Sequence, residues 1–410
     1  MKRIIYIAIA MVFILRHICL AQENLEALDA APKTGGTRAL SMGGVYIATN
    51  QGIDALSGNP GGLALLDGIQ ISVTGSVQIY GKSDFDDTYY SYYIAYSSKF
   101  EPLFKFTNIG IAVPITIPKA SIKLAGAAGY RRFYDWSRRK VVEKEYDYYE
   151  NGIVHSKETY KTHGLINVLS LGIGTTMSKK WSFGFSVNFP IWKNYENESE
   201  INDIYSDKIY KSNTQEERNV SADCFIQLGG ILQVTSKLAA GVSCLMKHGF
   251  TLQNVKRKSH YNGDVYSYEI DDKNKWEIPG TIDFGISYKL RPNLLLAADI
   301  QSRPWENIRI NDLPIDDVKN GNVYRFGLEF ERKVLFRAGF SWERLPLLDA
   351  DEHPVDLKNT TAGIGYQSKD FILDLGLSYK FVTFETQRWG EKWKYHIREF
   401  VIHTTLRHCF

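Results

Sequence analysis

The chain has 410 residues, of which 44% are hydrophobic, 13% aromatic and 23% charged, with a formal net charge of +3. Its length suits one large domain or two ordinary ones, and a composition with 12 Pro and 33 Gly excludes a long disordered or low-complexity tract. The near balance of charge gives no basis for nucleic-acid binding.

The N-terminal segment has the order of a secretory signal peptide. Two basic residues precede an apolar run over residues 4–15, and small residues follow it. The run is too short to span a bilayer as a helix. We therefore expect residues 1–21 to be a signal peptide that is cleaved after Ala21. A lipoprotein anchored at Cys19 is the alternative, which Arg16 and His17 oppose because small or aliphatic residues belong at those positions.

Removal of this leader changes the charge and the cysteine count. It takes away three basic and no acidic residues, so 46 basic and 46 acidic residues remain. The remaining cysteines are Cys224, Cys244 and Cys409, and their odd number and wide spacing predict neither a disulfide framework nor a zinc site. No later segment has 18 consecutive apolar residues, so we expect no transmembrane helix. We also expect no cofactor.

From residue 69 onward the sequence reads as a long series of strand-like segments. The later strands are expected at 163–177, 181–195, 217–235, 238–257, 275–290, 293–306, 322–332, 334–345, 357–368, 371–385 and 395–410. Tight turns link them at 178–180, 236–237, 291–292, 333 and 369–370, and long polar loops link them at 196–216, 258–274, 307–321, 346–356 and 386–394. Short and long connections alternate, which places all turns at one end of the strands. This layout is typical of an up-and-down β-barrel in the bacterial outer membrane, with short periplasmic turns and longer external loops.

The stretch FILDLGLSYKF at 371–381 raises the question of which strand face meets water. Read at a period of two, its leucines fall on one side, and Asp374 and Lys380 fall on the other. A soluble sandwich would bury the leucines, whereas a membrane barrel would turn them to lipid. Because the loop pattern favours the barrel, we expect the leucines to face lipid and the two charged residues to face the lumen.

The early strands and the C-terminus complete the expected barrel. Early strands at 69–81, 88–99, 106–117 and 120–136 bring the count to fifteen. A single-chain bacterial barrel needs an even number, so we expect about 14 strands, with a kinked or displaced segment near Pro114 and Pro118. The last strand ends on Phe410, a signal typical of substrates of the bacterial barrel-assembly machinery.

Residues 22–66 precede the barrel, which we expect over residues 67–410, and have too little apolar bulk for a core of their own. This segment contains Arg38-Ala39, Gly43-Gly44, Asp54-Ala55 and Asn59-Pro60-Gly61-Gly62-Leu63-Ala64. It resembles the N-terminal hatch of the long-chain fatty acid transporter (FadL) family of outer-membrane proteins, which has relatives in type IX secretion. The last element is usually Asn-Pro-Ala in that family, and Gly61 stands here in place of the Ala. Patches such as Pro279-Gly280 and Arg337-Ala338-Gly339-Phe340 extend the resemblance.

The resemblance implies a barrel whose lumen is plugged by the hatch. It implies a passive channel for long-chain fatty acids or other hydrophobic compounds, which bind near the external loops and leave sideways through the wall. A glycine-rich hatch held by polar contacts can rearrange at modest cost, as a ligand-triggered gate requires. The implied partners are hydrophobic small molecules, outer-membrane lipids including lipopolysaccharide, and the barrel-assembly machinery, for a monomeric protein.

The candidate hatch residues are Arg38, Asn59, Pro60 and Gly61, and the candidate luminal carboxylates are Asp283, Asp299, Glu329 and Asp374. Asn59 either hydrogen-bonds luminal groups while Pro60 fixes a turn, or the two form an ordinary Asn-Pro turn. Arg38 either pairs with a luminal carboxylate or is solvated. The carboxylates form either a polar route or a satisfied network that supports the plug, and we favour the network.

No catalytic motif stands out in the sequence. It has no HExxH, GxSxG, P-loop or strand-linked GxGxxG motif. His163, His248, His396 and His403 lie on or beside expected strands, but no spacing joins them to a nucleophile. We therefore expect a channel and not an enzyme. The alternatives are a barrel of the same fold that docks or shuttles secreted proteins, and a barrel lipid hydrolase.

Overall fold

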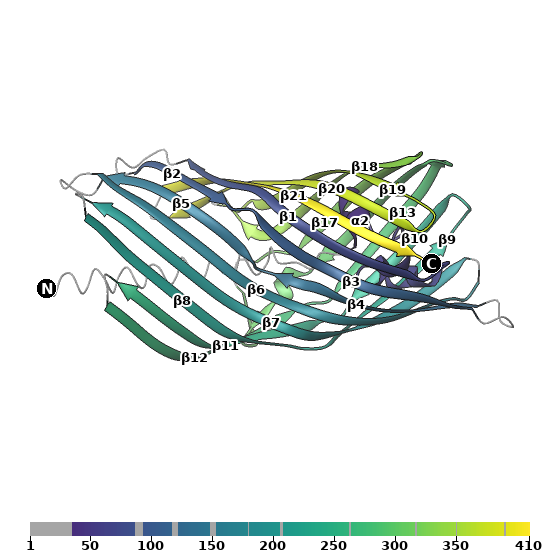
Figure 1. Cartoon of the computed structure of the whole chain (residues 1–410), viewed down its shortest axis with the longest axis horizontal. Coiled ribbons are helices and arrows are strands. Elements are labelled where there is room, and N and C mark those ends of the chain that lie inside the picture. Colours follow the sequence, from purple (N-terminus) through teal and green to yellow (C-terminus); the bar gives the residue numbers. More distant parts are fainter. Residues whose placement is uncertain are drawn as a thin grey trace.

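The computed structural model describes residues 35–410 apart from 87–92, 117–121, 148–152, 206–207, 262–263, 316–317, 389–390 and positions 179 and 350. The expected signal peptide and the first part of the hatch lie outside these residues. The described chain forms an elongated barrel with strands oblique to its long axis (Figure 1). Within the described residues, no helix has both the length and the apolarity needed to cross a membrane.

A closed ring of 14 antiparallel strands forms the barrel wall. In order around the wall these are β1 (Gln70–Asp86), β3 (Leu103–Thr116), β4 (Lys123–Asp135), β6 (Ile153–Thr176), β7 (Trp181–Tyr205), β9 (Phe225–Gln233), β10 (Leu238–Leu245), β13 (Thr281–Arg291), β14 (Leu294–Arg303), β17 (Gly321–Glu331), β18 (Val334–Leu348), β19 (Pro354–Gln367), β20 (Phe371–Arg388) and β21 (Glu391–Cys409). β21 pairs back with β1, from Gln70↔Cys409 to Asp86↔Lys394, and this closes the ring. The expected all-β barrel of 14 strands is therefore confirmed.

Further strands prolong one side of the wall beyond this ring. They are β2 (Tyr93–Phe100), β5 (Arg138–Asp147), β8 (Lys208–Ala222), β11 (His248–Tyr261) and β12 (Asp264–Ile278), with the short β15 (Arg309–Ile310) and β16 (Leu313–Pro314). We call this end of the molecule the extended end and the opposite end, where the tight turns lie, the turn end. The longer five continue wall strands across short breaks, as β2 continues into β3 across Glu101 and Pro102.

The odd strand count expected from the sequence has its explanation in one of these breaks. The expected strands at 88–99 and 106–117 are the two halves of a single strand, β2 and β3. The break lies at Pro102 and not near Pro114, which pairs with Ala125 inside the β3–β4 ladder, so the expected position was wrong. Pro102 lies between the two strand halves, where a missing backbone N–H removes no ladder bond. Pro118 lies outside the described residues.

An apolar band surrounds the turn end of the barrel. On β20, Phe371, Leu373, Leu375 and Leu377 are 39%, 44%, 44% and 42% exposed, whereas Asp374 is 1% exposed. Similar outward rows of large apolar residues occur on β7, β13 and β18. A surface that is apolar outside and polar inside is the inverse of a soluble protein and suits a hydrocarbon environment. The expected orientation of the leucines in FILDLGLSYKF is therefore confirmed.

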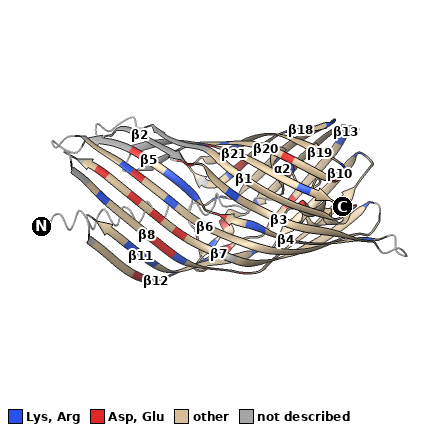
Figure 2. Cartoon of the chain, viewed as in Figure 1, with Lys and Arg blue, Asp and Glu red and all other residues tan. Residues whose placement is uncertain are grey.

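The extended end differs from what the sequence predicted. The long polar loops expected at 196–216 and 258–274 are largely strands, which belong to β7, β8, β11 and β12. Charged residues of both signs lie along this part of the wall, as Figure 2 shows. Ion pairs such as Lys161–Glu198, at 3.2 Å, link adjacent strands there. Strands that are in water on both faces need no alternation of apolar and polar residues. The alternation from which strands were predicted is therefore absent here.

Glu216 of β8 ties three positions of the extended end together. Its carboxylate accepts hydrogen bonds from Arg218 Nε at 2.7 Å and from Arg257 Nε of β11 at 3.1 Å. Burial alone would raise the pKa of Glu216, but Arg218 and Arg257 outweigh this effect, so the pKa lies below its ordinary value. The ionised Glu216 carboxylate therefore stabilises the folded extended end.

This depressed pKa predicts acid loosening of the extended end. The stabilisation is fully present above the unfolded pKa of about 4.3 and is lost as the pH falls through the lower folded value. We expect amide hydrogen exchange in β8 and β11 to accelerate between pH 5 and pH 2 after correction for the intrinsic exchange rate, with the turn-end part of the β1–β21 ladder, from Gln70↔Cys409 to Val77↔Ile402, as an internal control. Glu216→Gln should remove that acceleration; an unchanged pH response in this variant would contradict the assignment.

Candidate functional site

The described part of the hatch fills the barrel at the turn end. It contains the short helix α2 (Thr37–Ser41) and two 3-10 turns, η1 (Gly52–Leu56) and η2 (Pro60–Leu65). Met42, Tyr46 and Leu63 are at most 1% exposed. α2 contacts β20 and β19, whereas η2 contacts β6 and β7, so the segment spans the lumen from one wall to the other. We call residues 35–66 the plug.

Asn59 and Pro60 begin η2 at a point where the plug meets the wall. The Asn59 side chain accepts a hydrogen bond from Gly61 N at 3.1 Å. Its amide donates to Ile47 O of the plug at 2.7 Å and to Gly230 O of β9 at 3.2 Å. Pro60 occupies the first position of η2, where a missing N–H costs nothing. Asn59 thus does more than form a local turn, because it also joins the plug to the barrel.

Glycines on the luminal face of the wall let the plug lie directly against the strands. A side chain on Gly184 of β7 would overlap the Pro60 carbonyl, and one on Gly229 of β9 would overlap the Asn59 side chain. A Cβ at Gly61 would lie 2.9 Å from Gly230 Cα, so the Gly that replaces the family's usual Ala is required by close backbone contact.

A chain of buried charges holds the other side of the plug. The Arg38 guanidinium donates to Glu329 through Nε at 2.8 Å and through a terminal nitrogen at 2.7 Å. Arg337 donates to Glu329 at 2.7 Å and to Asp374 at 2.6 Å, and its side chain is 1% exposed. Two arginines and two carboxylates therefore alternate from the plug into β17, β18 and β20. This arrangement is a paired network and not an open polar path.

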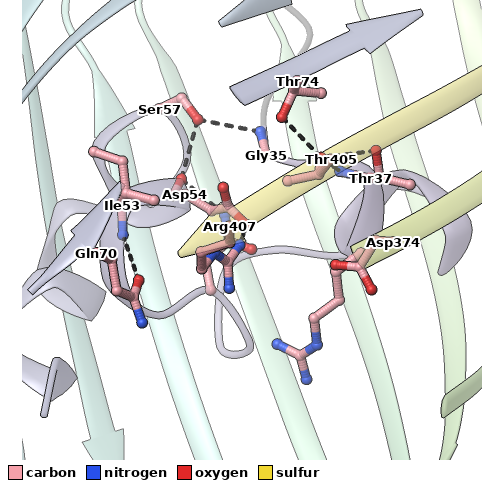
Figure 3. Close-up of polar contacts among 12 residues, drawn as sticks. Gly35, Thr37, Ile53, Asp54, Ser57, Gln70, Thr74, Asp374, Thr405 and Arg407 are labelled. Carbon is pink, nitrogen blue, oxygen red and sulfur yellow. Dashed lines mark hydrogen bonds and ion pairs between the residues drawn. The ribbon is translucent and has the colours of Figure 1, made fainter. Parts of the chain in front are cut away.

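Further plug contacts lie next to the C-terminal strand, as Figure 3 shows. Arg407 of β21 forms an ion pair with Asp54 of η1. Thr37 of α2 bonds to the Thr405 hydroxyl, which in turn lies 2.7 Å from the Thr74 hydroxyl of β1. The plug is thus fixed at the point where the last strand closes the barrel on the first.

Asp283 and Asp299 hold the middle of the plug. Asp299 accepts hydrogen bonds from the backbone N–H groups of Tyr46 and Ile47, at 2.7 and 3.0 Å. Asp283 accepts from the Tyr46 hydroxyl at 2.5 Å and from the Gln301 amide at 3.0 Å. All four luminal carboxylates singled out in the sequence therefore lie in the polar shell around the plug. Tyr46, the partner of Asp283, and Arg407, the partner of Asp54, carried no sequence signal.

A group of aromatic and aliphatic residues fills the lumen on the extended side of the plug. We call it the aromatic cluster, and its buried members are Phe133, Tyr134, Trp136, Ile166, Val168, Tyr195, Phe225, Phe250, Trp276, Trp305 and Ile308. The Phe133 and Phe225 rings lie 4.4 Å apart although β6 and β7 separate their strands in the wall, so the two meet across the lumen. Arg131 lies at the boundary with the plug, because it bonds Ser57 O and its guanidinium lies 5.1 Å from the Phe133 ring.

The segment 304–320 enters this cluster from the extended side. We call it the inner loop; positions 316–317 lie outside the described residues. Trp305 begins η3 (Trp305–Asn307) and is 6% exposed. Ile308, the residue that follows η3, is 0% exposed. Ile310 pairs with Trp276 of β12, and the turn that follows has positive φ at Asn311 and Asp312. The inner loop therefore packs as part of the cluster and does not extend freely away from the barrel.

Strand pairing lapses in the wall next to the aromatic cluster. The β3–β4 ladder runs from Thr116↔Lys123 to Asn108↔Arg131, and pairing resumes only between β2 and β5 at Phe100↔Lys140. Among the described residues, 103–107 have no ladder partner in β4. We call this stretch the first gap.

Aromatic residues border the first gap on both faces of the wall, and one lysine spans it. Lys105 spans it, with Nζ at 2.8 Å from Ser137 O and at 3.0 Å from an Asp135 carboxylate oxygen. On the outer surface Phe104 is 67% exposed. On the inner surface lie Tyr134 and Trp136, which stack at 5.6 Å. The gap therefore lies between the aromatic cluster and the outside of the barrel.

A similar lapse occurs along β7. The β7–β9 ladder ends at Asn188↔Phe225, and the β7–β8 ladder begins at Tyr195↔Arg218. In the described structure, residues 189–194 have no ladder partner on that side. We call this stretch the second gap. Cys224, which is exposed, lies beside it at the break between β8 and β9.

No catalytic or metal constellation was found among the described residues. No group of three or more His, Cys, Asp or Glu side chains there could hold a metal ion. His248 lies 2.8 Å from the Tyr134 hydroxyl, and His403 lies 3.1 Å from the Ser378 hydroxyl. Ser378 is 3% exposed and His403 6%, so this Ser–His contact is enclosed.

These features define a plugged β-barrel of the outer-membrane class. A scan of protein-family models finds no match to this chain, and a search of curated proteins finds none either. Solved structures do match. The Pseudomonas putida toluene transporter TodX is 15% identical, with a TM-score of 0.62 over 92% of this chain and 99% of that one.

Two other structures give the same picture. The CymD monoaromatic hydrocarbon channel is 14% identical, with a TM-score of 0.58 over 92% of this chain and 98% of that one. A Pseudomonas aeruginosa FadL homologue is 11% identical, with a TM-score of 0.55 over 93% and 98%. At these identities the likeness concerns the fold, and the fold is that of the FadL outer-membrane family.

Proposed function

We propose that this protein is an outer-membrane channel for hydrophobic small molecules, long-chain fatty acids among them, and that it works without catalysis. The observation that carries this proposal is the aromatic cluster, which fills the lumen between the inner loop and the plug and borders the first gap. An apolar ligand could replace packed side chains there without meeting an unpaired charge. The solved channels of the same fold, named for toluene and other hydrocarbons, support the same class of ligand.

Lateral release follows from energetics. Each CH₂ group kept out of water contributes about 0.8 kcal/mol, so a ligand in the cluster has little tendency to enter water beyond the plug. The first gap offers an apolar route to the membrane, because Tyr134 and Trp136 border it inside and Phe104 borders it outside. We infer that Lys105, bound to Asp135 and Ser137, acts as its latch.

The ligand class is tested by binding. Radiolabelled oleate and toluene should each be offered to the purified protein in detergent, and at least one should bind with saturation. Uptake by cells should be lost on deleting residues 22–60, which removes most of the plug. Saturable binding of neither probe, nor of any other hydrophobic compound, would contradict the proposal.

The exit route is tested by closing the first gap with a chemical tether. Phe104→Cys and Asp135→Cys would be bridged by a short bis-thiosulfonate reagent in a protein whose native cysteines are serine. We expect the tether to abolish ligand uptake into lipid while leaving binding in detergent intact, because only the passage through the wall is blocked. Release of the tether with reductant should restore uptake.

Two further tethers serve as a control and as a test of the second gap. Ile111 and Ala128 are already paired in the β3–β4 ladder, so cysteines bridged there should have little effect on uptake. A tether from Phe189→Cys to Cys224, which is kept as cysteine in this variant, would close the second gap instead. Loss of uptake with this tether and not with the first one would place the exit at the second gap and overturn the assignment.

The enclosed Ser378–His403 contact argues for a non-catalytic protein. A lipid hydrolase needs its nucleophile open to substrate, whereas Ser378 is 3% exposed and lies in the polar shell around the plug. Hydrolysis of a lipid ester by the purified protein that is abolished by Ser378→Ala would contradict this conclusion.

A further inference from the structure

The inner loop places one unpartnered hydrogen-bond donor inside the aromatic cluster. Trp305 is 6% exposed, and its indole N–H has no hydrogen-bond partner. A buried N–H without an acceptor is costly, so such groups are rare in folded proteins, and a bound ligand that supplies the acceptor would remove the cost. The Tyr134 hydroxyl in the same cluster differs, since it contacts His248 at 2.8 Å.

A second donor lies beside the first. The Arg303 guanidinium lies 5.5 Å from the centre of the Trp305 ring and is itself buried. Arg303 Nε also lacks a hydrogen-bond partner, although it faces a Glu343 carboxylate oxygen at 3.6 Å. The pair Arg303–Glu343 balances its own charge. The site therefore lacks acceptors while its net charge is already neutral.

We propose that Trp305 and Arg303 form a subsite for a ligand that combines an apolar, preferably aromatic, body with one uncharged hydrogen-bond acceptor, such as a ketone, an ester or an ether. The apolar body lies among the cluster residues and the acceptor oxygen receives the Trp305 N–H. A carboxylate ligand is disfavoured here because it would bring a second negative charge next to Glu343. This subsite rests on the proposed channel function and narrows its ligand class.

A matched pair of probes tests the subsite. Acetophenone and ethylbenzene have nearly the same shape and differ in the carbonyl oxygen, and benzoate adds the charge. Binding of each to the purified full-length protein in detergent would be measured by calorimetry. Satisfying a buried donor is expected to favour acetophenone over ethylbenzene about tenfold. Benzoate is expected to bind more weakly than acetophenone.

The variant Trp305→Phe removes the donor and keeps an aromatic ring. It should lose the preference for acetophenone over ethylbenzene, whatever its affinity for ethylbenzene. Equal affinities of acetophenone and ethylbenzene in the wild type, an unchanged preference in Trp305→Phe, or tighter binding of benzoate would overturn the subsite while leaving the channel intact. Because the wild-type ratio decides on its own, the test survives a variant that does not fold. Binding of no hydrophobic probe at all would instead contradict the channel function.

Discussion

Replacing Gly184 by leucine is expected to displace the plug and make the barrel permeable to ions and small polar solutes. Gly184 lies on β7, where its missing side chain leaves room for the Pro60 carbonyl. A leucine would occupy the same space, and the overlap is too large for rotamer changes to relieve, because the group it meets is backbone. Since η2 can no longer pack against β7 there, the hydrogen bond from Asn59 to Gly230 O of the wall should be lost as well.

The measurement is ion conductance in planar bilayers, where the wild type should be closed and Gly184→Leu should show a large, noisy conductance. Gly126→Leu on β4 is the matched control, because a Cβ at Gly126 meets no other atom within 4 Å. Heat-dependent gel mobility would show that both barrels are folded. A folded Gly184→Leu barrel that stays as closed as Gly126→Leu would refute the role of the plug as the seal.

The wall of the barrel was predictable because one face of each strand meets a single kind of environment. On β20 the alternation of leucines with Asp374 and Ser378 reports lipid on one side and the plug on the other, and the structure has that arrangement. The same reasoning failed at the extended end. Residues 196–216 alternate poorly because both faces of those strands are polar, so a pattern that depends on contrast reads them as loop.

The contacts of the plug were only partly predictable. The sequence singled out Arg38 and four luminal carboxylates by residue type, but the pairing of Arg38 with Glu329 joins positions 291 residues apart. No periodicity fixes such a contact, since it depends on the rotation of the plug in the lumen. Tyr46 and Arg407 were not predicted for a related reason. Their partners, Asp283 and Asp54, are distant in the sequence and come into contact with them only in the closed barrel.

The aromatic cluster could not be predicted from the strand pattern that predicted the barrel wall. Aromatic residues are good strand formers and also populate membrane interfaces, so sequence position alone would place Trp136, Trp276 and Trp305 at an interface near strand ends. The structure buries all three in the lumen. The bulge between Arg132 and Tyr134 turns Tyr134 and Trp136 inward, and a sequence reading at a strict period of two cannot register a bulge.

Removing the Arg337 guanidinium is expected to be the most destabilising single change in the polar shell. Its side chain is 1% exposed and donates to both Glu329 and Asp374. In Arg337→Met the two carboxylates stay buried while Arg38 remains to neutralise Glu329. Breaking one partner out of a buried ion pair costs about 3–5 kcal/mol, because the remaining charge is uncompensated. The measurement is urea unfolding of the protein in lipid vesicles, followed by tryptophan fluorescence.

The control and a second variant separate charge from packing in this prediction. Lys123 and Asp67 form an ion pair whose side chains are 59% and 87% exposed, so Lys123→Met should change the free energy of unfolding by less than about 1 kcal/mol. Adding Asp374→Asn to Arg337→Met neutralises the carboxylate that lost its partner and should recover part of the stability. If the second substitution instead adds to the loss, the damage comes from packing around residue 337, and the buried charges do not hold the plug as argued.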